Sequence, residues 1–515
     1  MGEYKTPGVY IKEKNAFGTS VVEVETAVPA FIGYTEKALN GTEDLTGKPW
    51  KITSMTEFIQ YFGGMHTPKY VIGKGEAPTP APAEESEDPK PAPADTGNSF
   101  KLKTAAGEFV VRIQNPYTLY LHMMLFFANG GGPCYIVSVG GYDSEFKKDL
   151  LERAIGTLEK ESEPTMIVIP EATNLQAADC YALQQAMADH CGDEMQKNRV
   201  ALLDVFIDCY PADPNKKVNY ADNFRNGFST NFPSYVAAYY PYLATSILSD
   251  SDVTPAMIAF DDEMDAFLVS LGLSEAQRKG LESVFPKNEK NTILKELDKN
   301  VHQALMQNSV AYQQLVKAIK DDLNLLPPSA AIAGVYSTVD SLRGVWKAPA
   351  NVTINSVVKP SVAINDYDQK ELNMPMSGKA INAIRTFPGE GLKIWGARTM
   401  DGNSQDWRYI NVRRTMIYLE QSVKNAARAY VFEPNDAGTW INMRCMIENF
   451  LRSVWKRGGL AGATPEDAFE VHVGLGDTMT GEDILEGILR ITVLVAISRP
   501  AEFIEITFQQ QMQKS

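Results

Sequence analysis

The chain has 515 residues, of which 44% are hydrophobic, and this length suggests about two to four domains. Its formal net charge of −15 argues against a nonspecific nucleic-acid binder, because such binding depends largely on Lys and Arg. The five cysteines form no C-x-x-C pair and no apolar run approaches ~18 residues, so we expect no zinc site, no disulfide framework and no membrane insertion.

The beginning of the chain contains short extended runs. Residues 8–12 and 20–26 are β-prone, and residues 28–34, VPAFIGY, are typical of a buried strand. Residues 75–97 are rich in Pro, Ala and acidic residues, so they cannot bury a core and predict an exposed insertion. Residues 100–112 alternate enough to predict a hairpin.

Helices and strands alternate in the next part of the chain. An apolar helical pattern begins at Leu119 and stops at the three glycines at 130–132, and residues 135–139 predict a strand. Further helices are predicted at residues 150–160 and 175–191, and buried strands at residues 165–169 and 200–207. This alternation predicts an α/β core.

The second half of the chain changes character twice. Residues 247–324 are rich in Glu, Lys, Gln and Leu at helical spacing, which predicts a mostly helical insertion. From Pro327 to about Thr399 the chain looks turn-rich. The remainder predicts two helices and three strands, at residues 412–429, 439–457, 469–473, 489–497 and 503–509.

Two glycine-rich stretches invite a phosphate-binding interpretation. A P-loop needs a Lys followed by Ser or Thr, but Pro133 and Cys134 follow the glycines at 130–132, which favours a helix stop. The stretch FPGEGLKIWG at residues 387–396 lacks the strand-before and helix-after context and predicts a turn.

The titratable residues form no recognisable catalytic or metal motif. His122 lies in an apolar helix and is expected to be a core residue. His190 and Cys191 are adjacent on a helix, so their side chains point in different directions. The acidic residues at 261–265 lack the glycine and terminal Glu of a calcium loop and fit a solvated helix start. We therefore expect no catalytic residue, no cofactor and no metal.

One basic feature reverses the sign of this acidic chain. The predicted helix at residues 439–457 ends in Arg452, Lys456 and Arg457. The same helix has an apolar stripe for the core, formed by Met443, Met446, Ile447, Phe450, Leu451 and Val454. The cations favour either a binding surface or an ordinary solvated helix end, where positive charge complements the helix dipole.

An ordered series of segments resembles the contractile tail sheath protein family. LPPSAAIAGVYSTVDSLRGVWKAPAN at residues 326–351 and LNMPMSGKAINAIRTFPGEGLKIWGARTM at residues 372–400 resemble its central signatures. WRYINVRRTMIYLEQSV begins the part similar to its C-terminal domain, and RPAEFIEITFQQQ resembles its C-terminal arm. TPGVYIKEK, VPAFIGYTEKA and FFANGGGPCYIVSV also match, so the resemblance covers nearly the whole chain.

The resemblance implies an α/β multidomain fold. Residues 1–27 would form an extended arm, residues 28–400 an α/β middle domain, and residues 401–515 an α+β C-terminal domain ending in an arm at 499–515. Two insertions, at about residues 66–107 and 246–325, depart from the simplest members and would decorate the outer surface.

The resemblance also implies a structural function. Sheath subunits stack as hexameric rings around an inner tube in a metastable helix, which a baseplate trigger releases to drive the tube through an envelope. The implied partners are copies of the chain, the inner tube, the baseplate and a terminal cap, without nucleic acid. Assembly would occur in the bacterial cytoplasm, before the particle is released or anchored. The alternative is a hydrolase or nucleotide-using enzyme on an α/β core.

Strand exchange between subunits suits a lattice that must stay connected while its subunits rotate, because backbone hydrogen bonds supply affinity while the linkers flex. The alternative is that both termini pair within their own domain. The resemblance implies exchange through Val9, Tyr10, Ile11, Phe503, Ile504, Ile506 and Phe508. The receiving sheet would contain Phe469, Val471, Val473, Ile491, Val493 and Val495. The implied contact with the tube is Arg452, Lys456 and Arg457.

Overall fold

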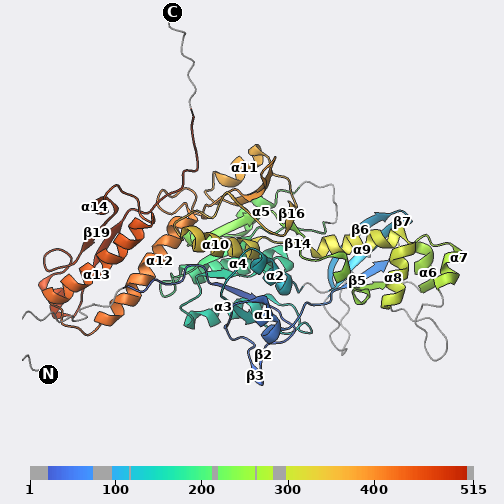
Figure 1. Ribbon diagram of the computed structural model, residues 1–515, viewed down its shortest axis with the longest axis horizontal. Helices are drawn as coiled ribbons and strands as arrows, with labels where there is room; N and C mark the ends of the chain where they lie inside the picture. Colours follow the sequence, from blue (N-terminus) through green and yellow to red (C-terminus); the bar gives the residue numbers. More distant parts are fainter. Residues whose placement is uncertain are drawn as a thin grey trace, which may run out of the picture. The chain divides into compact units, whose positions relative to one another are not determined.

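The computed structural model describes residues 21–73, 95–114, 117–211, 218–260, 264–281 and 297–506 (Figure 1). The chain divides into two compact units. We call Thr415–Ser498, together with Met1–Val24, the C-terminal unit, and Glu25–Arg414, together with Arg499–Ser515, the central unit. Both units combine helices with sheets, which confirms the mixed class predicted from the sequence.

A nine-stranded sheet forms the middle of the central unit, in the order β15-β18-β17-β11-β10-β9-β1-β8-β4. Neighbours from β17 to β8 run parallel, whereas β18, β15 and β4 join antiparallel. Every residue of β1, β8, β10 and β11 is buried, so both faces of the sheet are covered. The strands are β1 (Pro29–Gly33), β4 (Trp50–Ile52), β8 (Cys134–Ser138), β9 (Met166–Val168), β10 (Val200–Asp204), β11 (Val236–Tyr240), β15 (Val352–Thr353), β17 (Asn382–Phe387) and β18 (Gly391–Ile394).

Helices cover this sheet, and the predicted strand–helix alternation is confirmed. Among them, α2 packs against α10 and α3 packs against α4. Polar caps begin several helices: the side chain of Ser54 accepts a hydrogen bond from the first turn of α1, as Asn365 does for α11. The helices are α1 (Met55–Phe62), α2 (Leu119–Ala128), α3 (Lys148–Thr157), α4 (Ala177–Gly192), α5 (Tyr220–Gly227), α10 (Ser329–Arg343) and α11 (Asp366–Asn373).

The expectation of a turn-rich segment directly after Pro327 is wrong, because helix α10 begins at Ser329 and continues for 15 residues. This helix consists largely of small residues, which weaken its hydrophobic pattern. They are needed because α10 lies close to α2: a Cβ at Gly334 would lie 2.5 Å from the carbonyl oxygen of Phe126. The sequence pattern that obscured the helix is therefore a consequence of close helix packing.

The two predicted insertions contribute to one four-stranded sheet, ordered β13-β5-β7-β6. The expected hairpin is confirmed by antiparallel β6 and β7. The expectation of a mostly helical block omitted strand β13, which pairs parallel to β5. Residues 75–94 lie outside the described residues. The elements are β5 (Lys69–Gly73), β6 (Asp95–Thr104), β7 (Gly107–Gln114), β13 (Ile258–Phe260), α6 (Met264–Ser270), α7 (Glu275–Leu281), α8 (Lys299–Asn308) and α9 (Val310–Leu323).

Smaller elements complete the central unit. A three-stranded sheet contains β12 (Leu243–Thr245), β14 (Leu325–Leu326) and β16 (Val357–Pro360), and a small hairpin contains β2 (Leu39–Asn40) and β3 (Glu43–Asp44). Short 3-10 helices occupy Leu158–Lys160, Pro170–Asn174, Pro233–Tyr235, Asp250–Asp252 and Pro255–Met257.

The C-terminal unit is built on two long helices, α12 (Ile410–Ala427), from Thr415 onward, and α13 (Ala437–Lys456), as predicted. A 3-10 turn, Arg428–Tyr430, follows α12. The remaining elements are α14 (Pro465–Ala468), β19 (Phe469–His472), α15 (Gly481–Leu485) and β20 (Thr492–Val495).

Two segments predicted as strands near the ends of the chain do not form strands within this single chain. The described parts of these segments, residues 21–26 and 503–506, are not strands. A β-prone segment becomes a strand only when another strand satisfies its backbone groups, and none among the described residues pairs with these two. Residues 8–12 lie outside the described part of the chain.

Candidate assembly interface

The predicted receiving sheet exists as an antiparallel pair, β19 and β20. Phe469 lies opposite Val495, and Val471 lies opposite Val493. The side chains of Phe469, Val471 and Val473 are buried, and β19 packs against α13. Alternation along the strands therefore places the predicted apolar residues on the face that covers the helix.

The predicted residues of β20 are less buried than those of β19. Val493 and Val495 are half-buried, and Ile491, also half-buried, lies one residue before the strand begins. On the opposite face, Leu494 is 52% exposed. The structure thus brings the predicted residues together but leaves one strand incompletely covered.

Within the described residues, this sheet contains only two strands. An open strand edge presents backbone N–H and C=O groups that another chain can pair with. The loop between the strands is braced, because Thr480 caps α15, the carboxylate of Asp483 accepts hydrogen bonds from Thr480 in return, and Asp483 pairs with Arg490 at 3.0 Å. The hydrogen bond from the backbone of Thr480, followed by those from Arg490 and the Thr480 hydroxyl, lowers the pKa of Asp483 to about 2. The sheet is therefore a well-ordered template.

The segment that follows the N-terminal residues is fixed to the two long helices of the C-terminal unit. The guanidinium of Arg457 donates to both carboxylate oxygens of Glu23, at 3.0 and 2.6 Å, and to the hydroxyl of Tyr418. The backbone N–H of Val24 donates to the buried hydroxyl of Ser422 at 3.2 Å. The predicted exchange residues Val9, Tyr10 and Ile11 precede this anchor and lie outside the described residues.

Helix α13 carries the predicted apolar stripe, and all six of its residues are buried. Of the predicted tube-contact residues, Arg452 and Lys456 are exposed and form no ion pair with a described residue. Arg457 instead belongs to the anchor of Glu23. The sequence offered no signal for this pair, because its members are 434 positions apart.

The C-terminal segment is anchored to the central unit by one carboxylate that sequence reasoning missed. Arg398, only 2% exposed, donates from Nε to Oε1 of Glu502 at 2.9 Å and from Nη2 to Oε2 at 2.6 Å. Tyr409 and Asn373 also donate to this carboxylate, at 2.9 and 2.7 Å. Burial raises the pKa of Glu502, but the hydrogen bonds from Arg398, Asn373 and Tyr409 outweigh it, so the pKa lies below its ordinary value.

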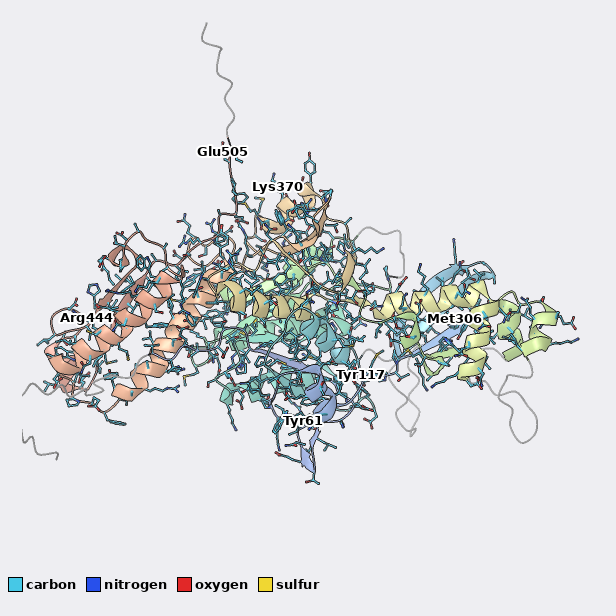
Figure 2. The ribbon with its side chains drawn as sticks, viewed as in Figure 1. Tyr61, Tyr117, Met306, Lys370, Arg444 and Glu505 are labelled. Carbon is cyan, nitrogen blue, oxygen red and sulfur yellow. The ribbon has the colours of Figure 1, made fainter. Side chains whose placement is uncertain are left out.

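Beyond this anchor the chain becomes solvent-exposed. Phe503, Ile504 and Ile506 are 70%, 78% and 69% exposed, and Phe508 lies outside the described residues. Figure 2 shows Glu505 on this segment, which leaves the central unit beside α11, the helix that carries Lys370. Three large apolar side chains in a short extended segment are typical of a surface that another molecule covers.

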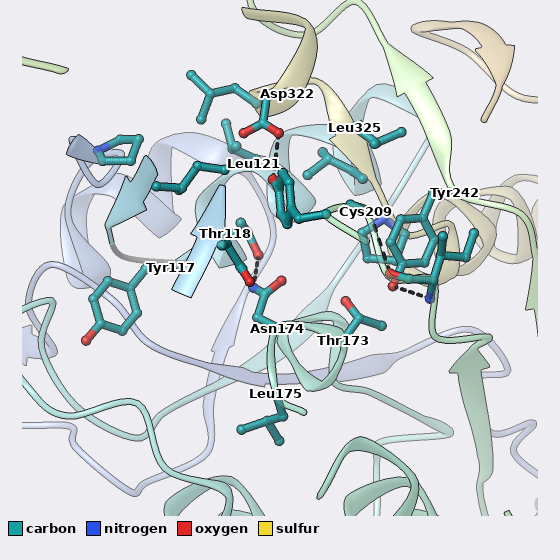
Figure 3. Close-up of a pocket in the computed structure, with 18 of the residues that line it drawn as sticks. Tyr117, Thr118, Leu121, Thr173, Asn174, Leu175, Cys209, Tyr242, Asp322 and Leu325 are labelled. Atoms are coloured by element: carbon teal, nitrogen blue, oxygen red, sulfur yellow. Dashed lines mark hydrogen bonds between the residues drawn. The ribbon is translucent and has the colours of Figure 1, made fainter. Parts of the chain in front are cut away.

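The central unit contains a cavity of about 670 Å³ whose lining includes several polar side chains (Figure 3). Asp322 on α9 accepts hydrogen bonds from the hydroxyls of Tyr70 and Tyr210, at 2.8 and 2.6 Å. Burial raises the pKa of Asp322 to about 6, although both hydroxyls lower it. Asn174 donates to the hydroxyl of Thr118 at 3.1 Å. These polar groups bind one another, and Asp322 joins α9 to β5 and to the loop after β10.

The other residues considered for catalysis or phosphate binding lie in surroundings typical of a structural role. Burial raises the pKa of the Cys191 thiol to about 12, so the thiolate needed for nucleophilic attack is disfavoured. Burial lowers the pKa of His122 to about 4, and its Nδ1 contacts the carbonyl oxygen of Thr118 at 2.8 Å, as expected of a core residue. Gly130, with φ of 83°, follows the end of α2, and a turn at residues 388–390 joins β17 to β18, so both predicted turns are confirmed. Strand β17 precedes the second turn, which corrects the expectation that no strand comes before it.

Two further features are absent from the described part of the chain. No group of three or more His, Cys, Asp or Glu side chains there is arranged to hold a metal ion. None of the described helices is both long enough and apolar enough to cross a membrane.

Comparison with known proteins identifies the family. Residues 161–400 match the phage tail sheath protein central domain, and residues 403–511 match the phage tail sheath C-terminal domain. The tail sheath protein of Vibrio phage KVP40 is 26% identical over 138 residues, which is 26% of this chain and 20% of that protein, so the match spans about a fifth of this curated relative.

Solved structures extend the similarity to nearly the whole chain. The contracted sheath of an extracellular contractile injection system, PVC, has a TM-score of 0.55 and 26% identity, with 99% of each chain covered. The contracted helical sheath of the anti-feeding prophage has a TM-score of 0.57 and 27% identity, with 99% of this chain and 100% of that chain covered. The chain belongs to the phage tail sheath protein family.

Proposed function

We propose that this chain is the sheath subunit of a contractile injection machine. Copies of the chain assemble as stacked rings around an inner tube in a metastable extended state. Contraction of the sheath then drives the tube through a target envelope. The observation that carries this proposal is the match of two contracted sheath structures to 99% of the chain.

The two ends of the chain are proposed to connect neighbouring copies. Phe503, Ile504 and Ile506 are exposed directly after the Glu502 anchor, and the β19–β20 sheet offers a two-stranded template. An arm that adds a strand to another copy's sheet combines strong backbone pairing with a flexible link. We extend the same role to Val9, Tyr10, Ile11 and Phe508, with β19 and β20 as the receiving strands.

The remaining partners follow from this role. The inner tube is proposed to contact the exposed cations Arg452 and Lys456, while Arg457 serves the Glu23 anchor. A baseplate would trigger contraction and a terminal cap would end the polymer. We propose assembly in the bacterial cytoplasm, followed by release or anchoring of the finished particle, and a structural rather than catalytic role.

Electron microscopy of the purified chain, alone and with its tube protein, tests the proposed function. We expect tubular sheaths with a helical repeat. Discrete monomers that turn over an ester or nucleotide substrate would instead support the alternative of an enzyme on the α/β core.

The register of the C-terminal arm gives a sharper test. Ile504 and Ile506 share one face of an extended chain and Glu505 lies on the other. Ile506→Asp should abolish sheath formation, because a charge would be buried in the receiving sheet, whereas Glu505→Lys should have a mild effect. Both proteins should remain folded, since these side chains are exposed. Sheath yield by sedimentation measures the difference, and the reverse ranking would contradict this register.

A further inference from the structure

A loop beside the C-terminal anchor displays two methionines to solvent. Met374 is 57% exposed and Met376 is 102% exposed. They follow α11 directly and flank Pro375, which is buried. We call Met374–Met376 the methionine loop. Met374 and Met376 together place two exposed apolar side chains at one site, and adjacent exposed apolar groups mark interaction surfaces more often than singly exposed side chains do.

The methionine loop is held rigidly in this exposed position. The backbone N–H of Met374 donates to the carbonyl oxygen of Lys370 at 3.0 Å, and that of Gly378 donates to Pro375 at 3.0 Å. Gly378 has φ of 75°, and a Cβ there would lie 2.6 Å from the side chain of Asn403. Because a tight turn and a close packing contact fix the loop, the exposure of its methionines is a property of the fold.

The loop lies next to the base of the C-terminal arm. Asn373, the residue before Met374, donates to Glu502 at 2.7 Å. An extended chain advances at most about 3.5 Å per residue, so Ile506 lies within roughly 14 Å of Glu502. Any sheet that receives the arm is therefore confined to the neighbourhood of the methionine loop.

The receiving unit is larger than this distance. Helix α13 alone has 20 residues, which corresponds to a length of about 30 Å at 1.5 Å per residue. A copy whose β19–β20 sheet pairs with residues 504–506 is therefore large enough to reach the base of the arm. Methionine suits such a contact, because its flexible, polarizable side chain adapts when the opposing surface shifts.

We propose that the methionine loop is a docking surface for a second copy of this chain, namely the copy whose β19–β20 sheet accepts the arm. The inference rests on the proposed strand exchange. It adds a side-chain contact that remains adaptable while the backbone pairing of the arm holds the two copies together.

The test compares Met374→Ser/Met376→Ser with Met195→Ser. Met195 is a matched control, because it is 85% exposed and lies in the loop after α4. The double variant should remain folded and need a roughly tenfold higher subunit concentration to form sheaths, since the apolar contact is lost. The control should assemble like the wild type. A double variant that also assembles like the wild type overturns the inference.

Ile506→Asp, measured in parallel, separates this inference from the proposed function. If Ile506→Asp abolishes assembly while the double methionine variant behaves like its control, strand exchange stands and the methionine contact fails. If Ile506→Asp assembles normally, the strand exchange fails, and the inference that rests on it fails as well.

Photo-crosslinking identifies the occupant of the surface. Met376→p-benzoylphenylalanine in assembled sheaths should give an adduct of two copies of this chain, with the crosslink inside residues 415–498 of the second copy. An adduct with the tube protein, or a crosslink to another part of the sheath subunit, overturns the assignment.

Discussion

At the scale of single residues, Glu502 is expected to contribute strongly to the free energy of unfolding, because its main partner Arg398 is only 2% exposed. Glu502→Gln removes the negative charge and leaves a buried guanidinium without its counter-ion. Since Glu502 remains 20% exposed, we expect a loss of about 2 kcal/mol, below the usual cost of breaking a fully buried pair. Urea denaturation measures the change, and Glu505→Gln, further along the arm, should stay within about 0.5 kcal/mol. Equal effects of the two variants would contradict this role.

Phe432 is a strained residue, with φ of 73° and a side chain that is 102% exposed. A bulky residue in this left-handed region costs about 1–2 kcal/mol, and a fully exposed ring has little packing to lose. Phe432→Gly should therefore stabilise the C-terminal unit by about 0.5–1 kcal/mol after the entropy of glycine in the unfolded chain is subtracted. Phe432→Ala, which keeps the strain, serves as the control in thermal unfolding. Destabilisation by both variants would show that the ring has a contact in solution, and destabilisation by Gly alone would show that the backbone at this position is not strained.

At the scale of elements, Asp204 at the end of β10 fixes the start of α10 by accepting a hydrogen bond from the N–H of Ser329 at 2.8 Å. Burial raises the pKa of Asp204 to about 7, against two hydrogen bonds from Ser329 that lower it. The folded protein thus retains a proton that the unfolded chain has already released, so this contribution to stability falls between about pH 4 and pH 7.

The Asp204→Asn variant has no ionisable side chain at this position. The stability of the wild type minus that of Asp204→Asn should therefore decrease as the pH rises from about 4 to about 7, as measured by urea midpoints. Asp321→Asn, an exposed site on α9, should show no such trend. A constant difference between the wild type and Asp204→Asn would mean that Asp204 is ionised in the folded protein throughout this range.

At the scale of the whole molecule, the exposed cations of α13 are expected to bind the tube weakly enough to release it. Exposed ion pairs contribute about 0–1 kcal/mol each and are screened by salt. Arg452→Glu/Lys456→Glu should give a folded subunit with reduced, less salt-sensitive association with tubes in a pelleting assay. Arg457→Glu should instead destabilise the C-terminal unit, because it breaks the pair with Glu23. Normal sheaths around tubes from the double variant would rule out this end of α13.

Several parts of the fold can be predicted from residues that lie close together along the chain. Short apolar runs predicted the buried strands of the central sheet, and spacing of three and four predicted the stripe of α13. The order of several motifs predicted the family, because each motif stands at a fixed place along the chain. These signals are local, so they survive in a single sequence.

Contacts between residues that are far apart along the chain could not be predicted in this way. Glu502 and Arg398 are 104 positions apart, and Glu23 and Arg457 are 434 positions apart, so no periodicity relates either pair. Helix α10 escaped prediction because its small residues are selected by contact with α2, and β13 because its partner is β5. An anchor, a close helix contact and a paired strand each require two segments to come together, and only the folded chain shows which segments do so.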